Sequence, residues 1–331
     1  MSGNLMRIYW LDYLKVYALF LVVLGHLPNG NLGLWIYGFH MPLFFYISGY
    51  LDKKSSVKKY FVRLFVPYLA LNFLYILIEF PWRYREFGGC SFFLNEVKSI
   101  IPFYSDNPVN YPTWFLLVLF LIKCFMNFLQ RNPLLLISML IVAVLIPLKI
   151  SLETHYLNLL LGGYVYYLLG WTTLRYQIYR PTPPIRLKIL KKYRCLLALL
   201  GVILIFLYSV ISYYYAISAW WHYSESLLLL PISLLGVVAH LFLFKSLFYY
   251  SKAHWILNLS QGAIAVVGLH ILGIQYSRRL LLAFGILEKW EDMNLFYSLL
   301  VSLIIMLLIY VSLPFIKLNF SWLIGLSGRK G

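Results

Sequence analysis

Residues 8–51 have the sequence IYWLDYLKVYALFLVVLGHLPNGNLGLWIYGFHMPLFFYISGYL. Residues 16–51 contain no formal charge, and their apolar character is broken at the turn-forming sequence PNGN, residues 28–31. Apolar segments of this length cross a bilayer as helices, because unpaired backbone groups would find no water there. We therefore predict a helical hairpin, with helices over about 8–26 and 34–51.

Further apolar runs follow this hairpin. They lie near 64–80, 113–129, 134–150, 156–173, 195–217, 226–244, 255–276 and 295–316. The chain has 331 residues, of which 62% are hydrophobic and 12% charged, whereas about a quarter of a soluble domain is charged. The sequence predicts an all-α fold in which residues 1–331 form a single polytopic transmembrane helix bundle with about ten membrane-spanning helices.

The basic residues indicate how the chain is oriented in the membrane. Lys and Arg total 28 against 11 Asp and Glu, which gives a formal net charge of +17. Cytoplasmic N- and C-termini place most of these basic residues in cytoplasmic loops, above all in 173–194, as the positive-inside rule requires. The excess charge is divided among loops beside anionic lipid and does not indicate nucleic-acid binding. We expect a multi-pass protein of the plasma (inner) membrane.

The first predicted helix carries three ionisable residues, Asp12, Lys15 and His26. Ionisable groups within membrane helices are destabilising and mark functional sites by default. At about 100° per residue, Lys15 and His26 lie within about 20° of each other on the helix surface and about 16 Å apart along its axis. Asp12 and Lys15 are expected to form an ion pair near the cytoplasmic side, with His26 near the outer end. A purely structural ion pair and a hydrogen-bonded interfacial histidine are the alternatives.

The residues around this helix resemble the membrane-bound acyltransferase family 3, which O-acylates carbohydrates. The first-helix signature of that family is a basic residue, ten intervening residues and a histidine, matched here by Lys15 and His26. The other matching residues are His40, Pro42, Leu43, Phe44, Phe45, Ser48, Gly49, Arg63, Leu64, Pro67, Tyr68, Trp114, Phe115, Leu116, Leu259, Ser260 and His270. The resemblance covers about 8–275. It implies transfer of an acyl group, in the first instance acetyl, from cytoplasmic acyl-CoA to a hydroxyl of a cell-surface or envelope carbohydrate such as a polysaccharide, with no tightly bound cofactor.

The same resemblance implies a donor site on the cytoplasmic face. Acetyl-CoA or another acyl-CoA carries phosphates, and Lys58, Lys59 and Arg63 supply cations on that side. Arg binds phosphate through two hydrogen bonds, and Lys binds it as a point charge. Many family members have Arg-x-x-Arg here, whereas the first position in this chain is Tyr60, with Lys59 as the nearest replacement. A basic cluster that only fixes topology is the alternative.

Acyl transfer to a sugar requires a base, because a sugar hydroxyl is a poor nucleophile, and histidine suits this role near neutral pH. We expect His26 to act as the general base, with Lys15 and Asp12 as further catalytic residues and the acyl arm extending past Lys15 toward His26. Covalent catalysis through an acyl-His26 intermediate is the alternative. Ser260 and His270 are about 80° out of phase on one predicted helix and are not expected to form a catalytic pair.

Three further residues are secondary candidates for binding the acceptor. His40 lies near the outer side of the second predicted helix, from where it could meet His26 across the hairpin. Trp114 could stack on a sugar or belong to the aromatic belt at the membrane interface. Ser48, together with Gly49, is explained more simply by close helix packing.

Other functions have less support in the sequence. An exporter or transporter of polysaccharide or lipid-linked glycan is the main alternative, and it predicts charges along a path through the bundle. Outside the first helix, however, only Lys123 is expected within a span. The three cysteines lack metal-ligand spacing, so no metal site is expected. The expected partners are the lipid bilayer, acyl-CoA and a carbohydrate, with a homo-oligomer left open.

Overall fold

A computed structural model describes residues 8–87, 91–102, 104–105, 107–149, 155–179, 192–215, 228–249 and 251–326. The helices are α1 (Tyr9–Gly25), α2 (Asn31–Tyr37), α3 (His40–Tyr50), α4 (Val57–Tyr60), the π-helical turn η1 (Phe61–Phe65), α5 (Val66–Phe87), α6 (Ser91–Ser99), η2 (Tyr111–Thr113), α7 (Trp114–Leu129), α8 (Pro133–Lys149), α9 (His155–Tyr179), α11 (Arg194–Tyr214), α12 (Leu229–Phe248), α13 (His254–Gln261), α14 (Ala263–Ala283), η4 (Trp290–Asp292), α15 (Leu295–Asn319) and η5 (Ser321–Ile324). The described residues contain no strand, which confirms the all-α prediction.

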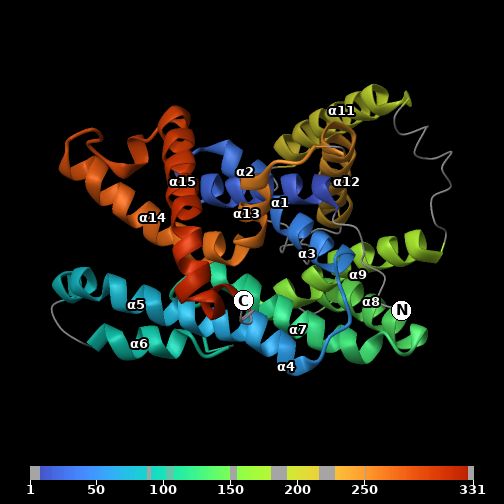
Figure 1. Cartoon of the computed structure of the whole chain (residues 1–331), viewed down its shortest axis with the longest axis horizontal. Coiled ribbons are helices and arrows are strands. Elements are labelled where there is room, and N and C mark those ends of the chain that lie inside the picture. Colours follow the sequence, from blue (N-terminus) through green and yellow to red (C-terminus); the bar gives the residue numbers. More distant parts are fainter. Residues whose placement is uncertain are drawn as a thin grey trace.

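Helix α1 lies in the middle of the molecule. In Figure 1, α5 to α9 lie in the lower half of the view, and α1 lies in the upper half with α15 on one side of it and α12 on the other. It contacts α2, α3, α12, α13, α14 and α15. Most of its apolar side chains are buried, as expected for a helix that is hydrophobic on nearly all faces. Ionisable residues on α1 are therefore placed inside the bundle.

The helix predicted over 34–51 is divided in the structure. α2 ends just before Gly38, and α3 begins at His40. A Cβ atom on Gly38 would lie 2.2 Å from Oη of Tyr208, whose hydroxyl donates to the carbonyl oxygen of Trp35 at 2.8 Å. The Tyr208 side chain of α11 thus packs directly against the break, and a larger residue at position 38 would have to displace the phenol.

Five helices among the described residues are long and apolar enough to cross a membrane. They are Val57–Phe87, Tyr111–Leu129, Arg194–Tyr214, Leu229–Phe248 and Leu295–Asn319. A sixth forms if α13 and α14, which are bent by 79° at their junction, make one span. Several apolar helices agree with a multi-pass membrane protein, but the prediction of about ten spans is not confirmed. Helices α1 and α8 have 17 residues each, fewer than the roughly 20 that cross the hydrocarbon core.

The orientation of the chain in the membrane stays a prediction. Both terminal segments lie outside the described residues, and so does 180–191, which includes much of the basic loop 173–194. The identity of the membrane and the single-domain organisation are likewise expectations from the sequence.

Helices α3 and α9 pack with their backbones in direct contact. A Cβ atom on Gly49 would lie 2.0 Å from the carbonyl oxygen of Tyr167, and a Cβ atom on Gly170 would lie 2.0 Å from that of Tyr46. Each helix therefore presents a glycine to the backbone of the other, as small residues do where membrane helices approach closely. The packing role expected beside Ser48 is confirmed for Gly49.

Candidate active site

His26 directly follows α1, and its side chain is half-buried. Its Nδ1 lies 2.8 Å from Oη of Tyr37, and the same Oη lies 2.8 Å from the carbonyl oxygen of Gly25. A carbonyl oxygen can only accept, so the single phenol proton of Tyr37 goes to Gly25, and His26 Nδ1 is the donor in its own bond. The hydrogen-bond network thus assigns the proton of neutral His26 to Nδ1 and the lone pair to Nε2.

A second histidine lies beside His26. The ring of His270 in α14 stacks on the His26 ring with centroids 5.2 Å apart and an interplanar angle of 19°, and Tyr111 approaches His26 edge-on at 5.0 Å. His270 is fully buried, and its Nδ1 donates to the carbonyl oxygen of Val266 at 2.8 Å. Helices α1 and α14 and the turn η2 therefore converge at the C-terminal end of α1.

Asp12 and Lys15 meet at Ser260, toward the opposite end of α1. The Ser260 hydroxyl donates to the Asp12 carboxylate, and Lys15 Nζ donates to the Ser260 carbonyl oxygen at 3.0 Å. Ser260 lies in the last turn of α13, where the helix dipole is negative and a cation is stabilising. The two expected partners on α1 therefore hold the junction at which the chain bends from α13 into α14.

A partly open cavity of about 340 Å³ lies at this end of α1. Its lining includes Asp12, Lys15 and Ser260, together with Asp52 and Lys53 from the segment that follows α3. The cavity thus combines cationic side chains with carboxylates, and it lies about 16 Å from His26 if measured along α1 from Lys15.

A buried ion pair fixes one wall of this cavity. Lys123 Nζ in α7 lies 2.5 Å from Oδ1 of Asp52 and 3.2 Å from Oη of Tyr167 in α9. Lys123 is the charge expected within a span outside the first helix, and its pairing with a carboxylate accounts for its position. The segment after α3 is thereby tied to both α7 and α9.

The residues predicted to bind the phosphates of the donor are exposed. Lys58 and Lys59 lie on α4 and Arg63 lies on η1, and none of the three is among the described residues that line the cavity. Lys53, five residues before Lys58, does line it. The structure therefore adds one basic residue to the predicted set and leaves the other three on the adjoining surface.

His40 lies close to His26 but contacts it through Tyr37. It is 2% exposed, its Nδ1 donates to the carbonyl oxygen of Ile36 at 2.8 Å, and its ring centroid is 5.4 Å from that of Tyr37. His40 therefore packs against Tyr37, which is hydrogen-bonded to His26.

The other two acceptor-site candidates lie elsewhere. Trp114, at the start of α7, is buried, and its ring centroid is 6.4 Å from that of Phe45 in α3. Ser48 is half-buried in α3, beside the glycine that contacts α9. The structure thus brings His40 to the His26 site, whereas Trp114 and Ser48 belong to the packing of α3.

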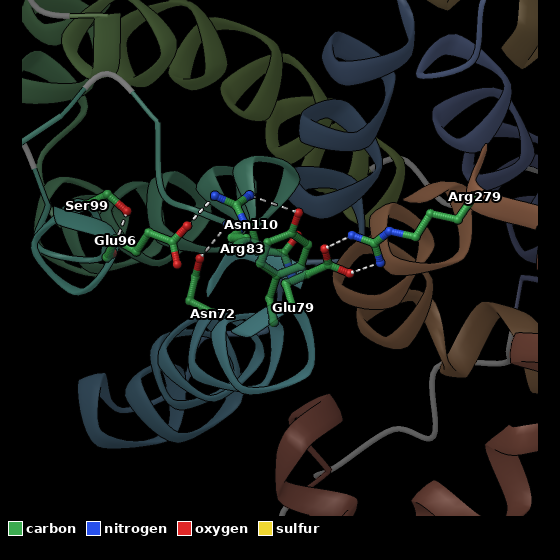
Figure 2. A network of polar contacts seen from close by, with 8 residues as sticks. Asn72, Glu79, Arg83, Glu96, Ser99, Asn110 and Arg279 are labelled. Atoms are coloured by element: carbon green, nitrogen blue, oxygen red, sulfur yellow. Dashed lines mark hydrogen bonds and ion pairs between the residues drawn. The ribbon is translucent and has the colours of Figure 1, made fainter. Parts of the chain in front are cut away.

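A network of charged residues lies among α5, α6 and α14 (Figure 2). Arg279 donates two hydrogen bonds to the buried Glu79 carboxylate, one of them 2.9 Å long. Arg83 donates to Glu96 and, at 3.5 Å, to Oη of Tyr75. Burial raises the pKa of the Glu96 carboxyl, and the charge of Arg83 opposes this rise. These pairs join α5 to the helices on either side of it.

Amide side chains next to this network position the aromatic wall of the site (Figure 2). The backbone N–H of Asn110 donates to Oδ1 of Asn72 at 3.0 Å, and its Nδ2 donates to the carbonyl oxygen of Gly268 at 2.8 Å. Asn110 directly precedes Tyr111, and Gly268 lies two residues before His270. Asn110 therefore fixes Tyr111 beside the histidines.

Two side chains that contact His26, His270 and Tyr37, were not among the candidate site residues predicted from the sequence, although His270 was among the residues that match the family. An ionisable residue within a predicted membrane span is a candidate functional residue by default, and His270 could have been recognised on this basis. Residues 255–276 were predicted to form one straight helix that carries both Ser260 and His270. This prediction is wrong, because α13 and α14 are bent by 79° at their junction. The two residues contact opposite ends of α1.

A protein-family model of the acyltransferase 3 type, described as an acyltransferase domain, matches residues 8–318. The match runs from the start of α1 to the last turn of α15 and includes both histidines and the cavity. Comparisons with curated proteins and with solved structures found no match. The family match indicates an enzyme and gives no support to the exporter considered from the sequence.

Proposed function

Because the chain belongs to the acyltransferase 3 family and is an acyltransferase, we propose that it moves an acetyl or similar acyl group from acyl-CoA to a hydroxyl of a carbohydrate, with His26 as the general base. The family acts in general in the O-acetylation of carbohydrates. One observation supports His26 as the base: its Nδ1 donates to Tyr37, so Nε2 keeps the lone pair that can take a proton.

The chemistry follows from this tautomer. The hydroxyl oxygen of the acceptor attacks the thioester carbonyl carbon while His26 Nε2 takes the hydroxyl proton. The carbon–sulfur bond then breaks, and the imidazolium returns its proton to the departing thiolate, which leaves an ester and free CoA. Tyr37 holds the ring by accepting from Nδ1–H before and after each proton transfer.

Attack by His26 Nε2 itself on the thioester is the second route, with an acyl-imidazole that the hydroxyl then opens. Both routes use the same lone pair. They differ in the order of release, because the covalent route frees CoA before the acceptor reacts. A burst of CoA equal to the enzyme concentration, measured without acceptor, identifies the covalent route, and its absence identifies general-base catalysis.

We propose that the donor binds at the cavity end of α1. The cavity offers Lys15 and Lys53, and the adjoining surface offers Lys58, Lys59 and Arg63, which supports binding of a polyphosphate ligand. The acyl arm would extend from there along α1 to His26. The positive-inside rule favours the cytoplasmic side for this end.

Mass spectrometry of cell-surface glycans tests the proposed function. We compare cells with the gene, cells without it, and cells carrying His26→Ala or His254→Ala at equal membrane level. His254 is exposed at the start of α13 and serves as a matched control. The proposal predicts one acyl mass increment per modified sugar with the wild type and His254→Ala, and no increment with His26→Ala. An increment that persists in His26→Ala contradicts it.

A further inference from the structure

His270 has a buried nitrogen whose hydrogen-bonding capacity is unused. The residue has 0% exposure, and its Nδ1 donates to the carbonyl oxygen of Val266 at 2.8 Å. Neutral His270 therefore has its lone pair on Nε2, which acts only as an acceptor. Nε2 has no hydrogen-bond partner among the described residues. A buried acceptor without a donor is uncommon in native proteins and indicates a partner that binds there.

The surroundings of His270 place its Nε2 close to His26, the proposed general base. Its ring stacks on that of His26 with centroids 5.2 Å apart, and Tyr111 lies edge-on to the same His26 ring. The Asn110–Gly268 hydrogen bond and the bond to Val266 fix this part of α14. A ligand that satisfies His270 Nε2 must therefore bind next to His26.

The reacting end of the donor does not satisfy this nitrogen, since a thioester has no hydrogen-bond donor. The hydroxyl that attacks the thioester does not satisfy it either, because its single proton goes to His26. A second donor group on the acceptor, close to the reacting hydroxyl, satisfies this nitrogen. A carbohydrate, with hydroxyls on neighbouring ring carbons, has this chemistry.

We propose that His270 is a positioning residue whose Nε2 accepts a hydrogen bond from a second hydroxyl of the carbohydrate acceptor, next to the hydroxyl that is acylated. This inference rests on the proposed function. It makes the enzyme selective for acceptors that carry a second hydroxyl beside the reacting one. His26 takes the proton in the reaction, and His270 orients the sugar.

Steady-state kinetics of the purified full-length enzyme in lipid nanodiscs tests this role. The acceptor is glycan isolated from cells that lack the gene, and the donor is acetyl-CoA. His270→Phe keeps an aromatic ring against His26 and removes the acceptor nitrogen, whereas His270→Gln keeps an acceptor oxygen on the side chain. We expect His270→Phe to raise KM for the glycan by about tenfold or more. The KM for acetyl-CoA and the pH profile of kcat should stay unchanged, and His270→Gln should recover part of the loss.

Two results would overturn the assignment. The first is an unchanged KM for the glycan in His270→Phe. The second is a shifted pH profile or a lowered kcat without a change in that KM, which would show that His270 acts only through His26. Should His270→Phe not fold, His270→Met is measured in its place with the same criteria. Failure of the proposed function is recognised separately, because the wild type would then transfer no acetyl group to the glycan.

Discussion

At the scale of single residues, the tautomer of His26 depends on one phenol. Tyr37→Phe removes the oxygen that accepts from His26 Nδ1–H and leaves the ring free to turn and to exchange tautomers. We expect kcat to fall by about 10- to 100-fold, part of the contribution of a general base, with little change in the KM for acetyl-CoA. Tyr84→Phe, at an exposed tyrosine on α5, is the matched control. A kcat within about twofold of the wild type would show that Tyr37 does not hold the base.

The sequence predicted His26 as the candidate base but did not predict which residues surround it. Lys15 and His26 could be recognised from the sequence because their spacing places both on one face of a helix. This placement follows from helix geometry alone. Tyr37 comes from the nearby α2, whereas Tyr111 and His270 come from η2 and α14, far along the chain, and their approach depends on tertiary packing. Lys15 likewise bonds Ser260, 245 residues away, which no spacing within α1 indicates.

At the scale of helices, the α3–α9 contact depends on the absence of two side chains. Gly49→Ala would put a Cβ atom 2.0 Å from the Tyr167 carbonyl oxygen, so the two backbones must separate. We expect a loss of about 1–3 kcal/mol in the free energy of unfolding, seen as a lower midpoint of thermal unfolding in detergent. Ser48→Ala, one residue earlier, adds no atom and should leave the midpoint unchanged. Equal midpoints for the two variants would show that the helices do not touch there.

Helix breaks were the part of the fold that the sequence did not reveal. Apolar runs predicted where helices exist, because burial in lipid or in the bundle needs apolar surface whatever the tertiary arrangement. At the break at Gly38, a Cβ atom would lie 2.2 Å from the hydroxyl of Tyr208 in α11. At the bend between α13 and α14, a Cβ atom on Gly262 would lie 2.4 Å from a methyl group of Leu313 in α15. Both interruptions lie where distant segments meet, which apolar runs do not reveal, so the count of spans was the weakest prediction.

At the scale of the whole molecule, the cavity lined by Lys15, Lys53, Asp12 and Asp52 and the histidine site lie at opposite ends of α1, so the two substrates should bind at opposite ends. The triple variant Lys58→Glu, Lys59→Glu, Arg63→Glu reverses the charge of the exposed basic surface beside the cavity. We expect it to raise the KM for acetyl-CoA by about tenfold, because the proposed donor site would present negative in place of positive charge to the phosphates, while the KM for the glycan stays the same. In the wild type the KM for acetyl-CoA should rise with salt.

Lys98→Glu, at an exposed lysine on α6, is the control for the triple variant, and its KM for acetyl-CoA should equal that of the wild type. If the KM for acetyl-CoA is unchanged in the triple variant, the basic cluster does not bind the donor and serves only to orient the chain in the membrane. An increase confined to the KM for the glycan would mean that the two substrates bind in the opposite arrangement.

The central claim is that His26 is required for transfer of an acyl group from acyl-CoA to a carbohydrate. The most direct test follows radiolabel from acetyl-CoA into isolated, unacylated glycan, using the purified enzyme in nanodiscs. Wild-type protein and His254→Ala should label the glycan and release one CoA per label, and folded His26→Ala should do neither. Labelling of the glycan by His26→Ala at the wild-type rate would contradict the account.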